Sequence, residues 1–143
     1  MDIFFEGPVI WAQLDANMHL RHSAYGDFAA QARLNMLDHV GIKARDLLSL
    51  HLGPILFREE IIYHREVGPN DHVKVSCRIS KSRKDGTRWS IRHEIFRQDG
   101  VKAATVNVDG AWMDTVKRKL GALPQELQEK FTTLPYSEDY VEE

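Results

Sequence analysis

Four polar residues close together near the N-terminus have side chains suited to acid–base chemistry. Asp15, Asn17 and His19 alternate along the chain, and His22 follows three residues later. A carboxylate such as that of Asp15 can act as a general base for water or as a direct nucleophile. Asn17 can orient a water or a carbonyl group, and His19 can orient Asp15 or carry a proton. The segment therefore predicts a site built around one carboxylate.

The elements on either side must position these residues. Residues 3–14 are rich in β-branched and aromatic side chains and predict a strand, broken or bent near Gly7-Pro8. Residues 23–40 have apolar side chains three and four positions apart, which indicates a helix of about 17 residues. Ser23 is the expected N-cap and Gly41 the residue that ends the helix. The polar segment thus meets a helix N-terminus, where unpaired backbone N–H groups can stabilise an oxyanion.

The second half of the chain predicts four strands, at residues 55–67, 73–79, 87–97 and 101–116. Three turn sequences separate them, Gly68-Pro69-Asn70-Asp71, Lys84-Asp85-Gly86 and Gln98-Asp99-Gly100. A short helical turn at 44–50 precedes these strands, and a short helix at 125–131 follows them. This order predicts an α+β fold, with a five-stranded antiparallel sheet and one long helix on one face. Such a sheet keeps a face or an edge uncovered, which favours self-association.

The composition fits a single domain over residues 1–143. The chain is 43% hydrophobic and 28% charged, with a formal net charge of −2, so it lacks the basic excess of a nucleic-acid-binding protein. We expect no membrane span, because no apolar run approaches the required length of roughly 20 residues. The single Cys77 cannot form an internal disulfide, which favours the reducing cytoplasm. The acidic segment Ser137–Glu143 is expected to be a solvated, partly disordered tail.

Residues 15–25, which read D-A-N-M-H-L-R-H-S-A-Y, resemble a segment of the hotdog-fold thioesterases. In this fold a curled antiparallel sheet wraps a central helix, and the likeness is to the 4-hydroxybenzoyl-CoA thioesterase and acyl-CoA thioesterase family. The family pattern is an Asp after a strand and a Tyr ten residues later in the first helical turn, here Asp15 and Tyr25. A variant seen in fatty acyl thioesterases reads Asp-x-Asn-x-His, which Asp15, Asn17 and His19 match. Similar segments follow at residues 53–57, 96–100 and 123–127.

This resemblance implies hydrolysis of an acyl-CoA or acyl carrier protein thioester, with Asp15 as the base or nucleophile. It places the oxyanion donor seven residues after Asp15, at the backbone N–H of His22, and puts Tyr25 beside the substrate. It also implies a site formed between two subunits, so we expect a homodimer or a homotetramer. We expect no cofactor and no metal ion.

Two other functions remain open, the first of them because of a departure from the family pattern and the second because it shares the fold. Many members carry a Glu on the helix about five residues after the Tyr, where this chain has Ala30 followed by Gln31. Asp15 would then supply the only acid at the site. An acyl-thioester-binding protein without catalytic activity is one alternative, and a hydroxyacyl dehydratase on the same fold is another.

Individual residues also have simpler interpretations. Asp15 and Asn17 can be turn residues that satisfy their own backbone, and the ring of Tyr25 can serve packing alone. Asp15, His19 and His22 can also be imagined as metal ligands, although no further spaced ligand lies nearby. Arg83 and Arg88 flank a predicted hairpin, where they can bind CoA phosphates or simply face solvent.

Overall fold

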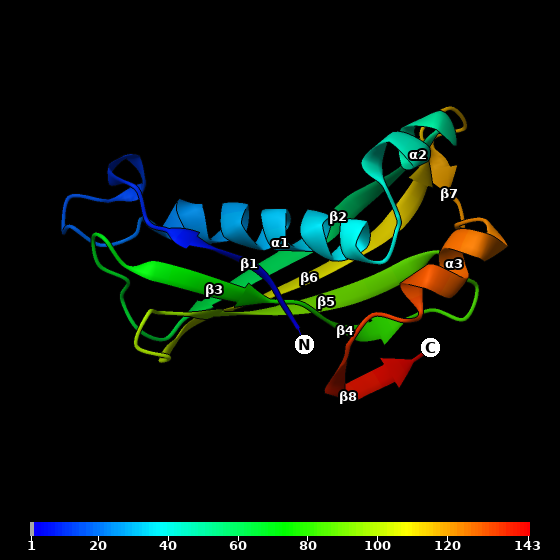
Figure 1. The fold of residues 1–143 in the computed structure, drawn as a ribbon. Helices are drawn as coiled ribbons and strands as arrows, with labels where there is room; N and C mark the ends of the chain where they lie inside the picture. The colour runs from blue at the N-terminus through cyan, green and yellow to red at the C-terminus, as the bar shows by residue number, and fades with distance from the viewer. Residues whose placement is uncertain (1) are drawn as a thin grey trace.

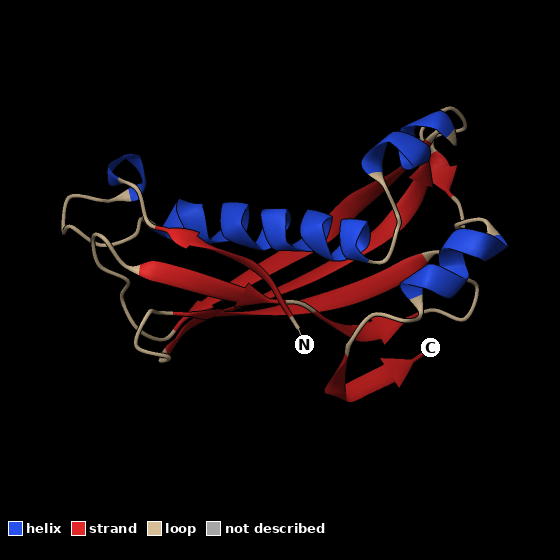
Figure 2. Ribbon diagram, viewed as in Figure 1, coloured by secondary structure: helices blue, strands red, loops and turns tan. Residues whose placement is uncertain are grey.

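Helix α1 (Tyr25–His39) forms where the apolar spacing predicts it and lies across the concave face of one curved sheet (Figure 1). The computed structural model describes residues 2–143. The side of α1 that faces the sheet is buried, through Tyr25, Phe28, Ala29, Ala32, Met36 and Leu37. Gly41 follows the helix with a φ of 87°, a left-handed conformation that glycine adopts without strain. Figure 2 shows the shorter helices α2 (Ala44–Ser49) and α3 (Gln125–Phe131) near the C-terminal end of α1.

The sheet has eight strands within the described residues. They are β1 (Ile3–Pro8), β2 (Leu52–Tyr63), β3 (His72–Ser76), β4 (Arg78–Ser82), β5 (Arg88–Phe96), β6 (Lys102–Asp114), β7 (Lys119–Leu120) and β8 (Tyr136–Glu142). Strand β5 pairs with β6 on one side and with both β3 and β4 on the other. Strand β2 lies beyond β6, β1 beyond β3 and β8 beyond β4. All pairs are antiparallel except β4 with β8. The predicted α+β hotdog architecture is therefore confirmed, although the sheet has eight strands where five were expected.

Three predicted strands have different limits in the structure, and the one expected at residues 55–67 runs instead from Leu52 to Tyr63. The strand expected at residues 73–79 is divided at Cys77, whose backbone N–H donates to the carbonyl of Asp2 (2.9 Å). The strand expected at residues 3–14 ends at Pro8 and gives way to a 3-10 turn, η1 (Trp11–Gln13). Proline has no N–H to continue a strand ladder. The chain therefore turns away from the sheet before it reaches Asp15.

The acidic segment Ser137–Glu143 is not the disordered tail that its composition predicts. Residues Tyr136–Glu142 form β8, which pairs in parallel with β4. The guanidinium of Arg92 donates two hydrogen bonds of 3.0 Å to Asp139, and this contact lowers the pKa of that carboxyl to about 2. The prediction fails because the cations that neutralise these acids lie on other strands of the sheet.

Strand β2 forms an open edge of the sheet, since β6 is the one strand with which it pairs in residues 2–143. It is 12 residues long and carries apolar side chains that are between 42% and 53% exposed, those of Leu56, Phe57, Ile62 and Tyr63. A long apolar edge of this kind is a template for pairing with another chain. None of the helices in residues 2–143 is long and apolar enough to cross a membrane.

Candidate active site

Asp15 lies in a tight loop that its own carboxylate helps to fold. Its Oδ1 accepts hydrogen bonds from the backbone N–H groups of Asn17 (2.9 Å) and His19 (3.1 Å). Met18 completes the loop with a left-handed φ of 60°. Asp15 is thus a turn residue, as the simpler interpretation of the sequence has it. The turn uses only Oδ1, however, and Oδ2 accepts no hydrogen bond from residues 2–143.

The N-terminus of α1 carries no side-chain cap. Ser23, the expected N-cap, instead accepts a hydrogen bond from Nε of Arg21 (3.0 Å), and Ala24 occupies the cap position. The expectation fails because a 3-10 turn, η2 (His22–Ala24), precedes the helix. The backbone N–H of His22 finds no acceptor among residues 2–143. An unused N–H at the positive end of a helix is a suitable donor to an anion.

Asp15 and His22 line the same solvent-open cleft, which has a volume of about 310 Å³. Tyr25 also lines it, although its side chain is buried and its ring packs edge-on against that of Tyr63, with centroids 5.1 Å apart. Burial raises the pKa of the Tyr25 hydroxyl to about 12, and nearby Tyr63, Asp15 and Glu66 act in the same direction. Tyr25 therefore stays protonated at neutral pH and combines packing with a place at the cleft.

Leu20 and residues 63–66, which the sequence pattern did not identify as site residues, complete the cleft, and Tyr63 and Glu66 matter most among them. Tyr63 ends β2, and its hydroxyl donates a hydrogen bond to the backbone carbonyl of His22 (3.0 Å). Glu66 lines the cleft together with Asp15, so the expectation of a single acid is wrong. The sequence signal that could have identified these residues is the polar run Y-H-R-E at residues 63–66, which ends a predicted strand shortly before the Gly68-Pro69 turn. Spacing alone does not reveal that this strand returns to the end of the sheet where α1 begins.

Asn17 and His19 differ in where the structure places them. The side chain of His19 lines the cleft, whereas Asn17 is exposed in the loop and does not line it. Among residues 2–143 no group of three or more His, Cys, Asp and Glu side chains could hold a metal ion. The fold brings Asp15, His19 and His22 together in the wall of one cleft.

Arg83 and Arg88 lie far from this cleft within one chain. They flank the turn between β4 and β5, where they line a separate cleft. Arg88, on β5, pairs with Ala111 of β6. Tyr63, at the Asp15 cleft, pairs with Ala104. The strand between these two positions spans about 23 Å, so neither arginine reaches the Asp15 cleft of its own chain.

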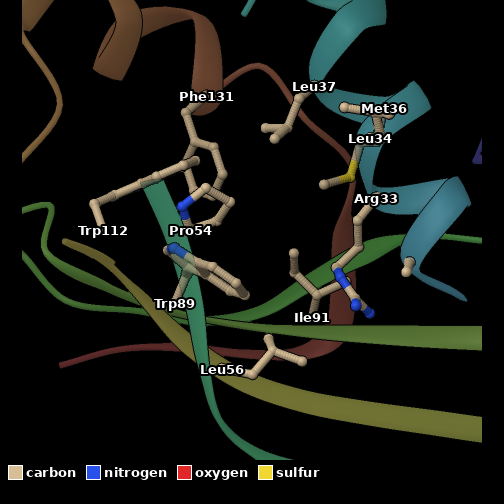
Figure 3. A pocket seen from close by; sticks show the side chains of 11 residues that line it. Arg33, Leu34, Met36, Leu37, Pro54, Leu56, Trp89, Ile91, Trp112 and Phe131 are labelled. Carbon is tan, nitrogen blue, oxygen red and sulfur yellow. The ribbon is translucent and has the colours of Figure 1, made fainter. Parts of the chain in front are cut away.

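A second, more enclosed cavity lies between the C-terminal half of α1 and the sheet (Figure 3). It has a volume of about 230 Å³ and walls that are mainly apolar, formed by side chains such as Leu37, Leu56, Trp89, Trp112 and Phe131. Ala30 lines it too, at the position where the resemblance leads one to expect a Glu. Among the described residues, Arg33 is the only charged one in its wall.

Comparisons with known proteins agree with this fold. The sequence matches the thioesterase-like superfamily over residues 9–131. No curated protein sequence gives a significant match. Among solved structures, the hypothetical protein SAV2348 from Staphylococcus aureus, determined in complex with CoA, superposes with a TM-score of 0.84 and 18% identity over 97% of this chain and 86% of its own.

Two further structures give a similar result. DHNA-CoA thioesterase from Staphylococcus aureus has a TM-score of 0.83 and 19% identity, over 92% of this chain and 89% of its own. YbaW, a probable thioesterase from Escherichia coli, has a TM-score of 0.78 and 18% identity, over 94% of this chain and 98% of its own. At these identities the structures establish the fold, and the sequence match establishes the family. The chain belongs to the thioesterase-like superfamily, which confirms the hotdog-fold thioester hydrolase that its sequence predicts.

Proposed function

We propose that the protein hydrolyses acyl-CoA thioesters at the cleft between Asp15 and His22. One observation carries the proposal: an unused carboxylate oxygen and an uncapped helix N-terminus line the same cleft. These are the two groups that attack on a thioester carbonyl requires. The relatives support CoA esters as the substrate class, because one was solved with CoA and another is a DHNA-CoA thioesterase.

Asp15 acts on the carbonyl carbon in one of two ways. As a base, it takes a proton from a water whose oxygen attacks the carbon. As a nucleophile, it attacks the carbon itself and forms an anhydride that water then hydrolyses. In both routes the negative oxygen develops at the N–H of His22, while the C–S bond breaks and the thiolate leaves. A thiolate is a good leaving group, so His19 needs only to orient Asp15 and return a proton.

The open edge of β2 supports a homodimer as the active form. Two β2 strands that pair antiparallel about a two-fold axis place the Leu52 end of one beside the Tyr63 end of the other. The Asp15 cleft of one subunit then adjoins the apolar cavity and the basic β4–β5 turn of the other subunit. This arrangement gives Arg83 and Arg88 access to the CoA phosphates, which the strand register within one chain does not allow.

A thiol-release assay over acyl-CoA chain lengths and aryl-CoAs tests the assignment of Asp15. Asp15→Asn is expected to lower kcat by about 10²–10⁴-fold without unfolding the chain. Asp46→Asn, a change of the same chemistry on exposed α2, serves as the matched control and keeps the wild-type rate. Full activity in Asp15→Asn would refute its role. Tight acyl-CoA binding without any thiol release would instead identify the non-catalytic binding protein.

Sedimentation velocity tests the dimer. Ile62→Lys puts a charge on the open edge of β2, outside both the cleft and the cavity, and is expected to give an inactive monomer. Leu48→Lys is the matched control, because Leu48 is exposed on α2, away from that edge. A wild-type protein that is fully active as a monomer would overturn this assembly.

A further inference from the structure

Arg33 carries a positive charge into the space between α1 and the sheet. Its side chain descends from the middle of α1 toward Ile91 and Leu56, at one side of the apolar cavity (Figure 3). Burial lowers the pKa of this guanidinium, yet an arginine remains protonated in a protein. A charge that is removed from water in this way requires compensation by a partner.

The hydrogen-bond partner that the structure provides for Arg33 is a neutral histidine. Nη1 of Arg33 lies 3.0 Å from Nε2 of His93, and Nδ1 of His93 lies 2.9 Å from the carbonyl oxygen of Ser76. Burial and the charge of Arg33 lower the pKa of His93 to about 3. A neutral ring that donates from Nδ1 must accept at Nε2. His93 therefore takes one N–H of Arg33 but supplies no negative charge.

No carboxylate forms an ion pair with Arg33 among residues 2–143. The negative charge of Glu59 raises the pKa of Arg33, but the two side chains form no ion pair. The carboxylate of Glu59 lies instead beside Gly26 at the beginning of α1, with Oε1 3.3 Å from the position that a Cβ on Gly26 would occupy. A guanidinium has five N–H donors, of which His93 takes one. Trp89, in the same cavity wall, adds a buried indole N–H that has no partner in the described residues. The cavity thus combines apolar walls with unused N–H donors and a cation that no carboxylate of residues 2–143 contacts.

We propose that this cavity selects acyl groups that carry a second, distal carboxylate, which Arg33 binds. The inference rests on the proposed function, because the acyl group reaches the cavity as part of a thioester. The apolar walls contact the chain or ring, and the planar fork of Arg33 matches a carboxylate with two parallel hydrogen bonds. An apolar cavity of about 150 Å³ holds a benzene molecule. A volume of about 230 Å³ therefore suits a short chain or a single ring.

The position of Arg33 on α1 separates it from the reacting carbonyl. The residues from Tyr25 to Arg33 span about 12 Å along the helix axis, whereas the N–H of His22 lies at its beginning. Arg33 therefore cannot contact an oxyanion held at the N-terminus of its own helix. In the proposed dimer the cavity instead adjoins the Asp15 cleft of the other subunit, and the acyl group enters the cavity from there. The carboxylate that Arg33 binds is then the one at the far end of the acyl group.

Hydrolysis of adipoyl-CoA and hexanoyl-CoA, which have the same number of acyl carbons, measures this selection. We expect the wild-type kcat/KM to be at least about tenfold higher for adipoyl-CoA, because of the two substrates only this one brings a carboxylate into contact with Arg33. Arg33→Met is expected to remove the preference, and Arg33→Lys to keep part of it and to serve if the methionine variant fails to fold. Arg45→Met, which removes an exposed arginine on α2, is the matched control and keeps the ratio.

Tryptophan fluorescence supplies a measurement that does not depend on turnover, because Trp89 and Trp112 line the cavity. Titration with adipate is expected to change the emission at lower concentration than titration with hexanoate, and Arg33→Met is expected to abolish this difference. Arg33-dependent binding of adipate without hydrolysis of either thioester would refute the proposed function while supporting the carboxylate site. Equal kcat/KM for the two thioesters and equal binding of the two acids in the wild type would overturn the proposal itself.

Discussion

The two ends of helix α1 are built on different principles. At its N-terminus, the cleft consists of exposed polar groups that are not fully satisfied, such as Oδ2 of Asp15 and the backbone N–H of His22. Along its C-terminal half, the cavity has mainly apolar walls and one charged residue, the half-buried Arg33. Changes at the first end should therefore alter the rate with little effect on stability. Changes at the second end should alter stability or substrate choice.

The largest expected effect on stability is at the apolar end. Trp112 is buried between Trp89 and Phe131, with ring centroids 5.9 Å from each. Trp112→Ala is expected to lower the free energy of unfolding by about 3–5 kcal/mol, measured by urea denaturation. Trp11→Ala is the matched control, because Trp11 is 78% exposed, and should change it by about 0.5 kcal/mol at most. Similar losses of unfolding free energy in both variants would contradict the tight packing of Trp112 in the cavity wall.

The largest expected effect on rate is at the polar end. His22→Pro removes the backbone N–H assigned to the oxyanion and is expected to lower kcat by about 10²–10³-fold. The backbone tolerates the change, because His22 begins a helical turn and Arg21 has φ −65° and ψ 147°, as a residue before proline requires. His22→Ala keeps the backbone N–H and should lower kcat by about threefold at most. Equal losses in the two variants would assign the role to the imidazole instead.

This difference between the two ends also explains what the sequence could reveal. Asp15, His19 and His22 lie within a few residues of one another, and the helical period of the following segment places them at a helix N-terminus. Local pattern was therefore sufficient to predict an α+β fold and to place these three residues together, and the resemblance added the hotdog architecture. Glu66 could not be placed there, because its position depends on the register of β2 against β6 over the whole strand.

The apolar cavity was hidden for a related reason. It is formed by α1, β2, β5, β6 and α3, and no periodicity within one element shows which side chains leave space between elements. Arg33 alone on a helix is typical of a solvated face. His93 carried a usable signal, since it alternates with Ile91 and Ile95 on the inward side of β5. A polar side chain on a buried row predicts hydrogen-bond partners inside the fold, which here are the carbonyl of Ser76 and the half-buried Arg33.

A third prediction concerns the pH dependence of stability at the apolar end. His93 is neutral in the folded chain because burial and Arg33 lower its pKa to about 3, while the Cys77 thiol beside it stays neutral because burial raises its pKa. The unfolded imidazole takes up a proton below about pH 6.5, so stability is fully present above that pH and is lost as the pH falls. The free energy of unfolding should fall by about 2 kcal/mol more from pH 8 to pH 5 in the wild type than in His93→Gln. Parallel curves for the two proteins would show that His93 is protonated in the folded chain.

The smallest expected effect links the two ends of the comparison through Tyr63. Tyr63→Phe removes the hydroxyl that donates to the His22 carbonyl but keeps the ring that packs against Tyr25. Tyr63 is half exposed, so the lost bond should lower the free energy of unfolding by about 1 kcal/mol or less. The turn keeps its N–H but holds it less firmly, so kcat should fall about fivefold, well short of the loss in His22→Pro.

Tyr136→Phe is the matched control for this change. Tyr136 is similarly exposed on β8, and its hydroxyl donates to the carbonyl of Thr132 (2.8 Å), away from the cleft. It loses the same kind of bond and should keep the wild-type rate in the thiol-release assay. If Tyr63→Phe lowered the free energy of unfolding by clearly more than about 1 kcal/mol and left kcat unchanged, the polar end of α1 would also be maintained by packing. The division between a reactive end and a packed end of the helix would then be wrong, and Tyr63 would belong to the core rather than to the site.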